Sequence, residues 1–122
     1  MDKKLILIVD DEAPVRNVLL QAFQFAGYEV IEAADGEAGF DLFQKKLPAL
    51  VITDIYMPKM NGILLLRQIR RHGYKAKVIM ITGFAHYHQL TLDASSSPDG
   101  YFEKPFTLAE LLSKANEVLT AA

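Results

Sequence analysis

The feature that most constrains the fold of this chain is a set of short runs that are apolar almost without interruption. Three runs, at 5–9, 50–53 and 78–82, consist mainly of Leu, Ile and Val and are too short for helices. Since polar and apolar residues do not alternate, each run is typical of a strand buried on both faces. Weaker runs at 29–33 and 101–103 follow turn-forming residues and bring the predicted strands to five.

Helical periodicity fills the segments between these runs. Apolar residues recur at helical spacing over 15–26 and over 108–119, and Thr107 with Glu110 forms the pattern of a capping box before the second stretch. Further helices are expected after Gly36, over 63–71 and, with sparser apolar positions, over 86–95.

The alternation of strands and helices predicts an α/β fold: a doubly wound, five-stranded parallel sheet flanked by about five helices. A chain of 122 residues has room for one domain, so we expect residues 1–122 to form a single unit. Sheets of this kind bind ligands beyond the carboxyl ends of their strands. The residues that follow each strand are therefore the candidate functional residues.

Composition argues against several classes of function. Lys plus Arg number 13 against 15 Asp plus Glu, so the net charge of −2 offers no basic field for nucleic acid. The absence of Cys excludes disulfides and Cys-ligated zinc. The N-terminal apolar run is too short for a secretory signal, and no stretch is long enough to cross a bilayer. We expect a cytoplasmic protein without a membrane partner.

Charged and polar residues follow the predicted strands. They are Asp10, Asp11 and Glu12 after the first, Asp54 after the third, Thr82 at the end of the fourth and Lys104 after the fifth. Taken singly, each is a common turn or surface residue. Gathered at one edge, the carboxylates would repel one another unless a cation were bound. Mg²⁺ fits, because it takes one or two carboxylates and shares its other positions with water and phosphate.

These residues carry a specific resemblance. The acidic pair at 10–11, the segment Asp-Ile-Tyr-Met-Pro-Lys-Met-Asn-Gly at 54–62, Thr82 and the segment Lys-Pro-Phe at 104–106 resemble the receiver domain of two-component response regulators. The likeness covers essentially the whole chain, and the separate elements match in order and spacing. It implies the flavodoxin-like strand order 2-1-3-4-5.

The resemblance also implies a role for each residue. Asp54 would be the phosphoacceptor and would form an acyl phosphate. Asp11, Asp54 and the main-chain carbonyl of Tyr56 would hold Mg²⁺, with Asp10 acting directly or through a water. Lys104 would bind a phosphoryl oxygen, and its peptide bond to the following proline would be cis.

The implied output is a signalling switch rather than an enzyme, although such a domain catalyses its own phosphorylation and dephosphorylation. Thr82 would move toward the phosphoryl group and Tyr101 would change rotamer in step. The expected phosphodonor is a sensor histidine kinase or a histidine phosphotransfer protein. The signal would leave through the surface of the fourth helix, fifth strand and fifth helix, to an unidentified effector or through homodimer formation on phosphorylation. Since nothing follows Ala122, we expect a partner, onward phosphotransfer or a further domain to provide the output.

Two departures from the family pattern matter. Ser97-Pro98 replaces the usual Gly-Ala pair before the fifth strand, so the family pattern does not predict the structure of the region 86–98. Tyr56 and Phe84 stand two residues beyond Asp54 and Thr82, and we hypothesise that these aromatic rings shield the acyl phosphate from water.

Other functions remain as alternatives. A Mg²⁺-dependent phosphohydrolase of the haloacid dehalogenase type would need a second Asp two residues after its nucleophile, but Tyr56 follows Asp54 at that spacing, and Glu12 follows Asp10. A flavodoxin-type carrier would need a phosphate loop where the acidic residues stand. A degenerate receiver that only binds partners would not need Asp54, Thr82 and Lys104 together.

A basic run outside these motifs has no assigned role. It comprises Arg67, Arg70, Arg71, Lys75 and Lys77, and no acidic residue interrupts it. Cations near a helix C-terminus are favourable in any case, so we interpret the run as a solvated helix end rather than a docking surface.

Overall fold

The computed structural model describes residues 3–83 and 97–120. Its strands form one parallel sheet in the order β2-β1-β3-β4-β5, as predicted. The strands are β1 (Leu5–Val9), β2 (Glu29–Ala33), β3 (Leu50–Asp54), β4 (Lys77–Thr82) and β5 (Gly100–Glu103). The helices of the described residues are α1 (Ala13–Phe25), α2 (Gly36–Lys46), α3 (Gly62–Arg71) and α5 (Leu108–Thr120). The helix expected within 86–95 lies outside the described residues.

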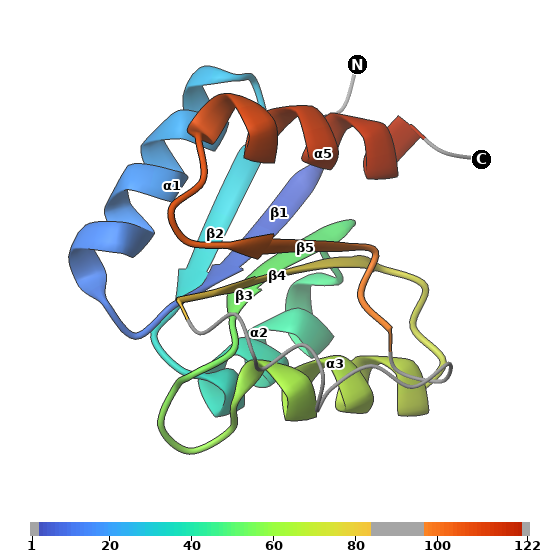
Figure 1. Ribbon diagram of the computed structural model, residues 1–122. Coiled ribbons are helices and arrows are strands. Elements are labelled where there is room, and N and C mark those ends of the chain that lie inside the picture. The colour runs from blue at the N-terminus through green and yellow to red at the C-terminus, as the bar shows by residue number, and fades with distance from the viewer. Residues whose placement is uncertain (1–2, 84–96, 121–122) are drawn as a thin grey trace.

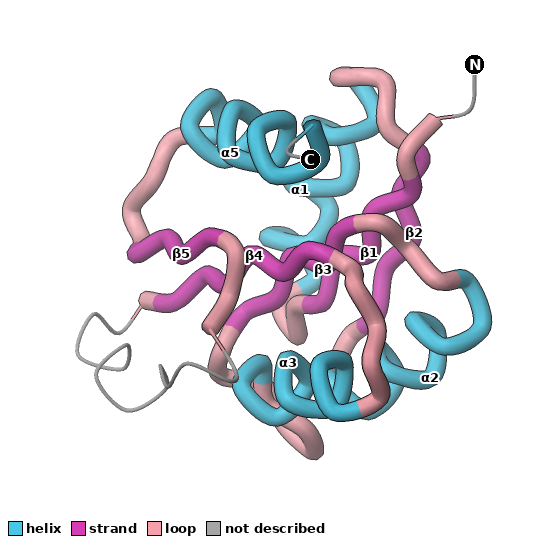
Figure 2. Tube along the Cα trace, turned by 90° about the vertical axis from the view of Figure 1, so that its right-hand side faces the viewer, coloured by secondary structure: helices cyan, strands magenta, loops and turns pink. Residues whose placement is uncertain are grey.

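The sheet is the middle of three layers (Figures 1 and 2). Helices α1 and α5 cover one face, and α2 and α3 cover the other. The alternation of side chains along β1 shows how both faces are filled: Ile6 and Ile8 join the core under α1 and α5, whereas Leu7 and Val9 join the core under α2 and α3. All four are fully buried, which explains why this strand reads as an unbroken apolar run.

Local hydrogen bonds start the helices where the sequence predicts. Asp35 accepts from the Ala38 N–H at 2.8 Å, and this bond caps α2. Thr107 and Glu110 form the expected capping box: the Glu110 N–H donates to Thr107 Oγ1 at 3.1 Å, and the Thr107 N–H donates to Glu110 Oε1 at 3.2 Å. These caps fix where the loops at the carboxyl edge of the sheet end.

Candidate functional site

Four acidic residues converge where β1 and β3 end. Asp10, Asp11 and Glu12 follow β1, and Asp54 is the last residue of β3. Since Val9 of β1 pairs with Thr53 of β3, the two strands end side by side. Each acid offers a carboxylate oxygen, and these oxygens all lie within 4.8 Å of one another. Asp10 and Asp54 are 2% and 6% exposed, whereas Asp11 and Glu12 are open to solvent.

Burial makes the two inner carboxylates hard to ionise. It raises the pKa of Asp10 to about 6; the Glu12 N–H, which donates to Asp10 Oδ1 at 2.8 Å, opposes the shift, and the charge of Asp54 adds to it. Burial likewise raises the pKa of Asp54, although Lys104 and two backbone N–H groups favour its charged form. A bound cation would relieve this cost.

The acidic cluster fits a small divalent ion. Oxygen ligands on opposite sides of Mg²⁺ are about 4.2 Å apart, because each Mg–O bond is about 2.1 Å. The carboxylate oxygens of the cluster all lie within 4.8 Å of one another, so a shift of roughly half an ångström would bring them to that spacing. The donor set is entirely oxygen, as Mg²⁺ prefers, and the exposed Asp11 and Glu12 leave one side open to water or a ligand.

Lys104 brings a cation close to Asp54. Its Nζ lies 3.7 Å from Asp54 Oδ2, although β4 separates the two strands that lead to these residues. The Lys104 N–H donates to the Thr82 carbonyl at 2.8 Å, so the lysine is held against the end of β4. The Lys104–Pro105 peptide bond is cis, as expected. Thr82 itself is fully buried.

The loop after β3 turns back tightly over Asp54. The Gly62 N–H donates to the Ile55 carbonyl at 2.9 Å, and the Ile55 N–H donates to the Ile81 carbonyl at 3.0 Å. A Cβ atom at Gly62 would lie only 2.2 Å from the carbonyl oxygen of Asp54. Glycine is therefore required here by the close approach of two backbones. The Tyr56 N–H, in the same loop, donates to Asp54 Oδ1 at 3.3 Å.

Arg16 supports the site, and the sequence analysis missed it. From α1, its Nη1 donates to the Asp10 carbonyl at 2.7 Å, and its Nε donates to Glu32 Oε1 at 2.6 Å. The arginine thus ties the loop of acidic residues to the end of β2. The only signal in the sequence is a basic residue one helical turn after Glu12, which is too common a pattern to single out.

Two further predicted residues, Tyr101 and Tyr56, lie among the described residues. Tyr101 pairs with Met80 in the sheet and packs, partly buried, against the core under α2 and α3. Tyr56 is 41% exposed. Phe84, its suggested partner in shielding, lies outside the described residues.

A comparison with family models matches residues 6–116 to the response regulator receiver domain. The chain belongs to this family. It is a domain of two-component signalling, and its fold agrees with that membership.

Curated relatives of this receiver domain are regulators. A probable transcriptional regulator ycf27 of Porphyridium aerugineum is 34% identical over 119 residues, which cover 98% of this chain and 49% of the relative. Response regulator MprA of Mycolicibacterium vanbaalenii is 33% identical over 114 residues, covering 93% and 49%. The chain thus spans about half the length of the curated relatives it matches.

Solved structures are similar over nearly the whole receiver domain. A CheY-like receiver domain protein of Methanospirillum hungatei has a TM-score of 0.89 at 33% identity, covering 97% of this chain and 94% of that one. Response regulator TrrA of Thermotoga maritima, solved in complex with Mg²⁺ and BeF, has a TM-score of 0.85 at 37% identity, covering 94% and 98%. Among the described helices of the receiver domain, none is long and apolar enough to span a membrane.

Proposed function

We propose that residues 1–122 act as a phosphoacceptor switch and that Asp54 is the residue phosphorylated. The observation that carries this proposal is that the Asp54 carboxylate lies close to both kinds of charge. Three other acidic side chains share its oxygen cluster, and the Lys104 ammonium lies 3.7 Å from Asp54 Oδ2. A phosphoryl group on Asp54 could be bound both by a metal held in the cluster and by the lysine.

In the proposed reaction, a carboxylate oxygen of Asp54 attacks the phosphorus of a phosphohistidine. A P–O bond forms, the P–N bond to the imidazole breaks, and the imidazole nitrogen keeps the electron pair. Lys104 would pair its positive charge with a negatively charged phosphoryl oxygen while the phosphoryl group is transferred to Asp54. Asp10, Asp11, Asp54 and the Tyr56 carbonyl would hold Mg²⁺, which supplies positive charge to the transferred group.

The donor would be a sensor histidine kinase or a histidine phosphotransfer protein in the cytoplasm. An apolar hollow of about 380 Å³, lined by residues that follow Glu12 and Lys104 in the chain, supports docking of such a partner. Its lining includes Pro14, Val15 and Val18 at the start of α1, together with Phe106 and Leu108. Val18 is 52% exposed and Leu108 is 37% exposed, so both leave apolar surface on which a partner helix could pack. Both residues follow site residues in the chain: Val18 comes after Asp11, and Leu108 comes after Lys104.

Phosphorylation would be read out through β5 and α5. Thr82 ends β4 and pairs with Glu103, and Tyr101 stands two residues before that glutamate. A shift of Thr82 toward a new phosphoryl group would therefore displace the paired residues of β5, where Tyr101 could change rotamer. The effector that reads this surface, or a homodimer formed through it, would carry the signal onward.

Intact mass spectrometry tests the proposal. The chain is incubated with acetyl phosphate with and without Mg²⁺, as the natural sequence, as Asp54→Asn and as Asp41→Asn, a control that removes an exposed acid of α2. We expect one phosphoryl group on the natural chain and on the control, only with Mg²⁺, and none on Asp54→Asn. Donor turnover without an adduct would favour the phosphohydrolase instead, and neither adduct nor turnover would favour a degenerate binding module.

A further inference from the structure

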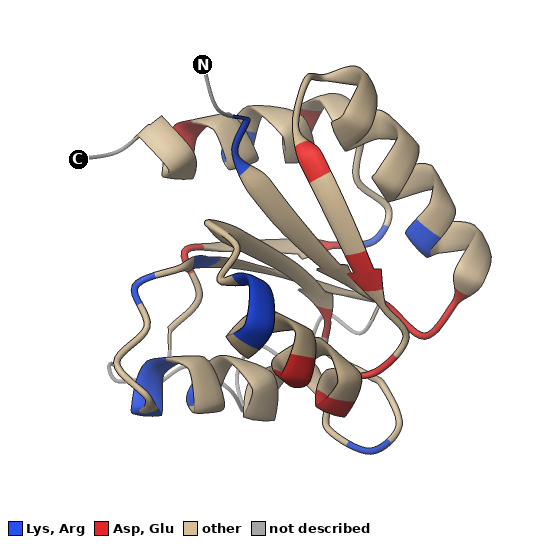
Figure 3. Cartoon of the chain, turned by 180° about the vertical axis from the view of Figure 1, so that it is seen from behind, with Lys and Arg blue, Asp and Glu red and all other residues tan. Residues whose placement is uncertain are grey.

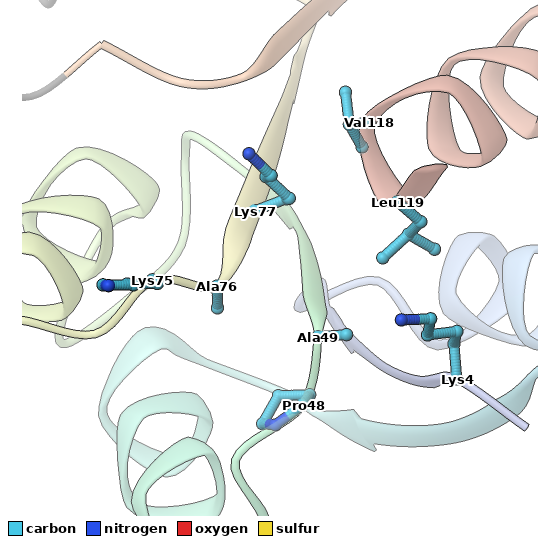
Figure 4. A pocket seen from close by; sticks show the side chains of 8 residues that line it. All are labelled: Lys4, Pro48, Ala49, Lys75, Ala76, Lys77, Val118 and Leu119. Atoms are coloured by element: carbon cyan, nitrogen blue, oxygen red, sulfur yellow. The ribbon is translucent and has the colours of Figure 1, made fainter. Parts of the chain in front are cut away.

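The edge of the sheet opposite Asp54 carries a second hollow with a basic lining. It lies where the amino ends of β1, β3 and β4 meet the last turn of α5, and its volume is about 300 Å³. Figure 4 shows Lys4, just before β1, on one side, and Lys75 and Lys77, at the start of β4, on the other. Between them the surface is apolar, with Pro48 and Leu119 among the lining residues.

The positive charge of this hollow is not neutralised within the described residues. The ion pairs found in 3–83 and 97–120 do not include Lys4, Lys75 or Lys77. The C-terminus of α5, whose last turn contains no basic residue, contributes only about −0.5 of a charge. Lys4, Lys75 and Lys77 all line the hollow, so its lining carries more positive charge than the partial charge at the end of the helix offsets.

Charge is divided along α2, although not over the whole domain: Asp99 accepts from the Val78 N–H next to Lys77, and Arg16 donates to the Asp10 carbonyl. In Figure 3 the loop after β1 and the first turns of α2 are red, whereas the last turn of α2 and the segment leading into β4 are blue. The acidic cluster would repel an anion in the absence of a metal, so the lysine side of the molecule is where an anion would collect.

The wall of the hollow is held in a defined position. Arg70 of α3 donates from Nη1 to the Ala76 carbonyl at 2.7 Å and from Nη2 to Asp99 Oδ2 at 2.8 Å. Its charge is thus committed to Asp99, and its hydrogen bond fixes the backbone between Lys75 and Lys77. The Lys77 N–H in turn donates to the Ala49 carbonyl at 2.9 Å. The lysine stems start from a fixed backbone, which lowers the entropy cost of closing them on a ligand.

We infer that this basic hollow binds a small organic anion with at least two negative charges, a phosphate ester or a polycarboxylate. Lysine ammonium groups bind such oxygens as point charges. The apolar surface at Pro48 and Leu119 would hold the uncharged body of the ligand. A volume of about 300 Å³ is at the lower end for ligand sites, which favours a small metabolite over a nucleotide cofactor. This site is independent of phosphorylation at Asp54.

Titrations followed by amide NMR test the inference, with phenyl phosphate and citrate as probes. Protein and buffer are freed of divalent metal beforehand with a chelating resin, so that no metal draws an anion to Asp54 and no soluble chelator competes for the hollow. Two charge-matched triple variants are compared: Lys4→Gln/Lys75→Gln/Lys77→Gln removes the lysines of the hollow, and Lys3→Gln/Lys45→Gln/Lys46→Gln removes three exposed lysines that do not line it.

We expect saturable shifts at Ala49, Ala76 and Leu119 in the natural chain and in the matched control. The affinity should fall by about tenfold or more in the variant of the hollow, as loss of one or more charge-assisted contacts predicts. Tighter binding of phenyl phosphate would identify a phosphate ester, and tighter binding of citrate a polycarboxylate. Equal weakening in both triple variants, or shifts without saturation, would overturn the inference. Lys77→Gln alone repeats the test should the triple variant not fold.

Discussion

Asp10→Asn should stabilise the metal-free domain at neutral pH, although it removes a residue of the proposed site. Burial raises the pKa of Asp10 from 3.8 to about 6, so the folded state holds this proton more tightly than the unfolded state does. The free energy of unfolding therefore falls as the pH rises from about 4 to about 6, and the loss is complete above that range. Asparagine carries no charge, so the free energy of unfolding of the variant does not fall with pH for this reason.

The magnitude follows from the same pKa. Each pKa unit corresponds to 1.36 kcal/mol, so ionised Asp10 costs the folded, metal-free protein about 3 kcal/mol above pH 6. Asn keeps the Oδ1 that accepts from the Glu12 N–H, but its buried amide lacks an assured acceptor, at a cost of about 1 kcal/mol. The expected net gain is about 2 kcal/mol, or about 8 °C in Tm for a chain of this length.

Urea unfolding followed by circular dichroism, between pH 4 and pH 8 in EDTA, measures this difference. The gap between Asp10→Asn and the natural chain should be small near pH 4 and full above pH 6, and Asp41→Asn, at an exposed position, should show no such growth. Added Mg²⁺ should stabilise the natural chain and act much less on Asp10→Asn. A variant that is less stable in EDTA at pH 7, or a gap independent of pH, would refute the argument from burial.

Three further substitutions probe the backbone and the support of the site. Gly62→Ala should lower the free energy of unfolding by about 3 kcal/mol in urea, because the new Cβ would overlap the Asp54 carbonyl; a loss under about 1 kcal/mol would show that the loop yields easily. Leu47→Gly should raise the free energy of unfolding by about 1 kcal/mol, and with it Tm, since Leu47 directly follows the last residue of α2, has φ 48° and is 59% exposed; an unchanged Tm would count against strain there. Arg16→Gln should weaken Mg²⁺ binding about tenfold in calorimetry, because the Asp10 carbonyl loses its donor; unaltered affinity would make Arg16 purely structural.

Much of the fold is visible in the sequence because its central strands are buried on both faces. Leu50, Val51 and Ile52 are at most 1% exposed, so burial dictates each of these residues, and the apolar run marks the strand directly. The capping box at Thr107 is equally local. Asp54 differs, since the sequence places it after the strand, whereas pairing with Ile81 extends β3 through it. Backbone pairing at the end of a strand depends on the neighbouring strand and not on the side chain.

The parts that the sequence does not reveal depend on contacts across the fold. Gly62 can be predicted as a turn residue, but its closeness to the Asp54 backbone requires the loop to fold back. Arg16 meets Glu32 only because β1 and β2 pair in register, with Ile8 opposite Glu32. The lysines of the basic hollow were interpreted in part as a solvated helix end, because Lys4 lies far from Lys75 in the chain and only the sheet brings them to one hollow.

The position of β2 at one end of the sheet has a consequence for solubility. Within the sheet it pairs with β1 alone, so its other edge presents backbone groups that a strand from another molecule could use. Both Glu29 and Glu32 are exposed on this short strand, and a second copy approaching edge to edge would bring carboxylates against carboxylates. The charge of Glu32 is paired with Arg16, whereas Glu29 takes part in none of the ion pairs found among the described residues, so Glu29 helps most to keep copies of the domain from joining their sheets.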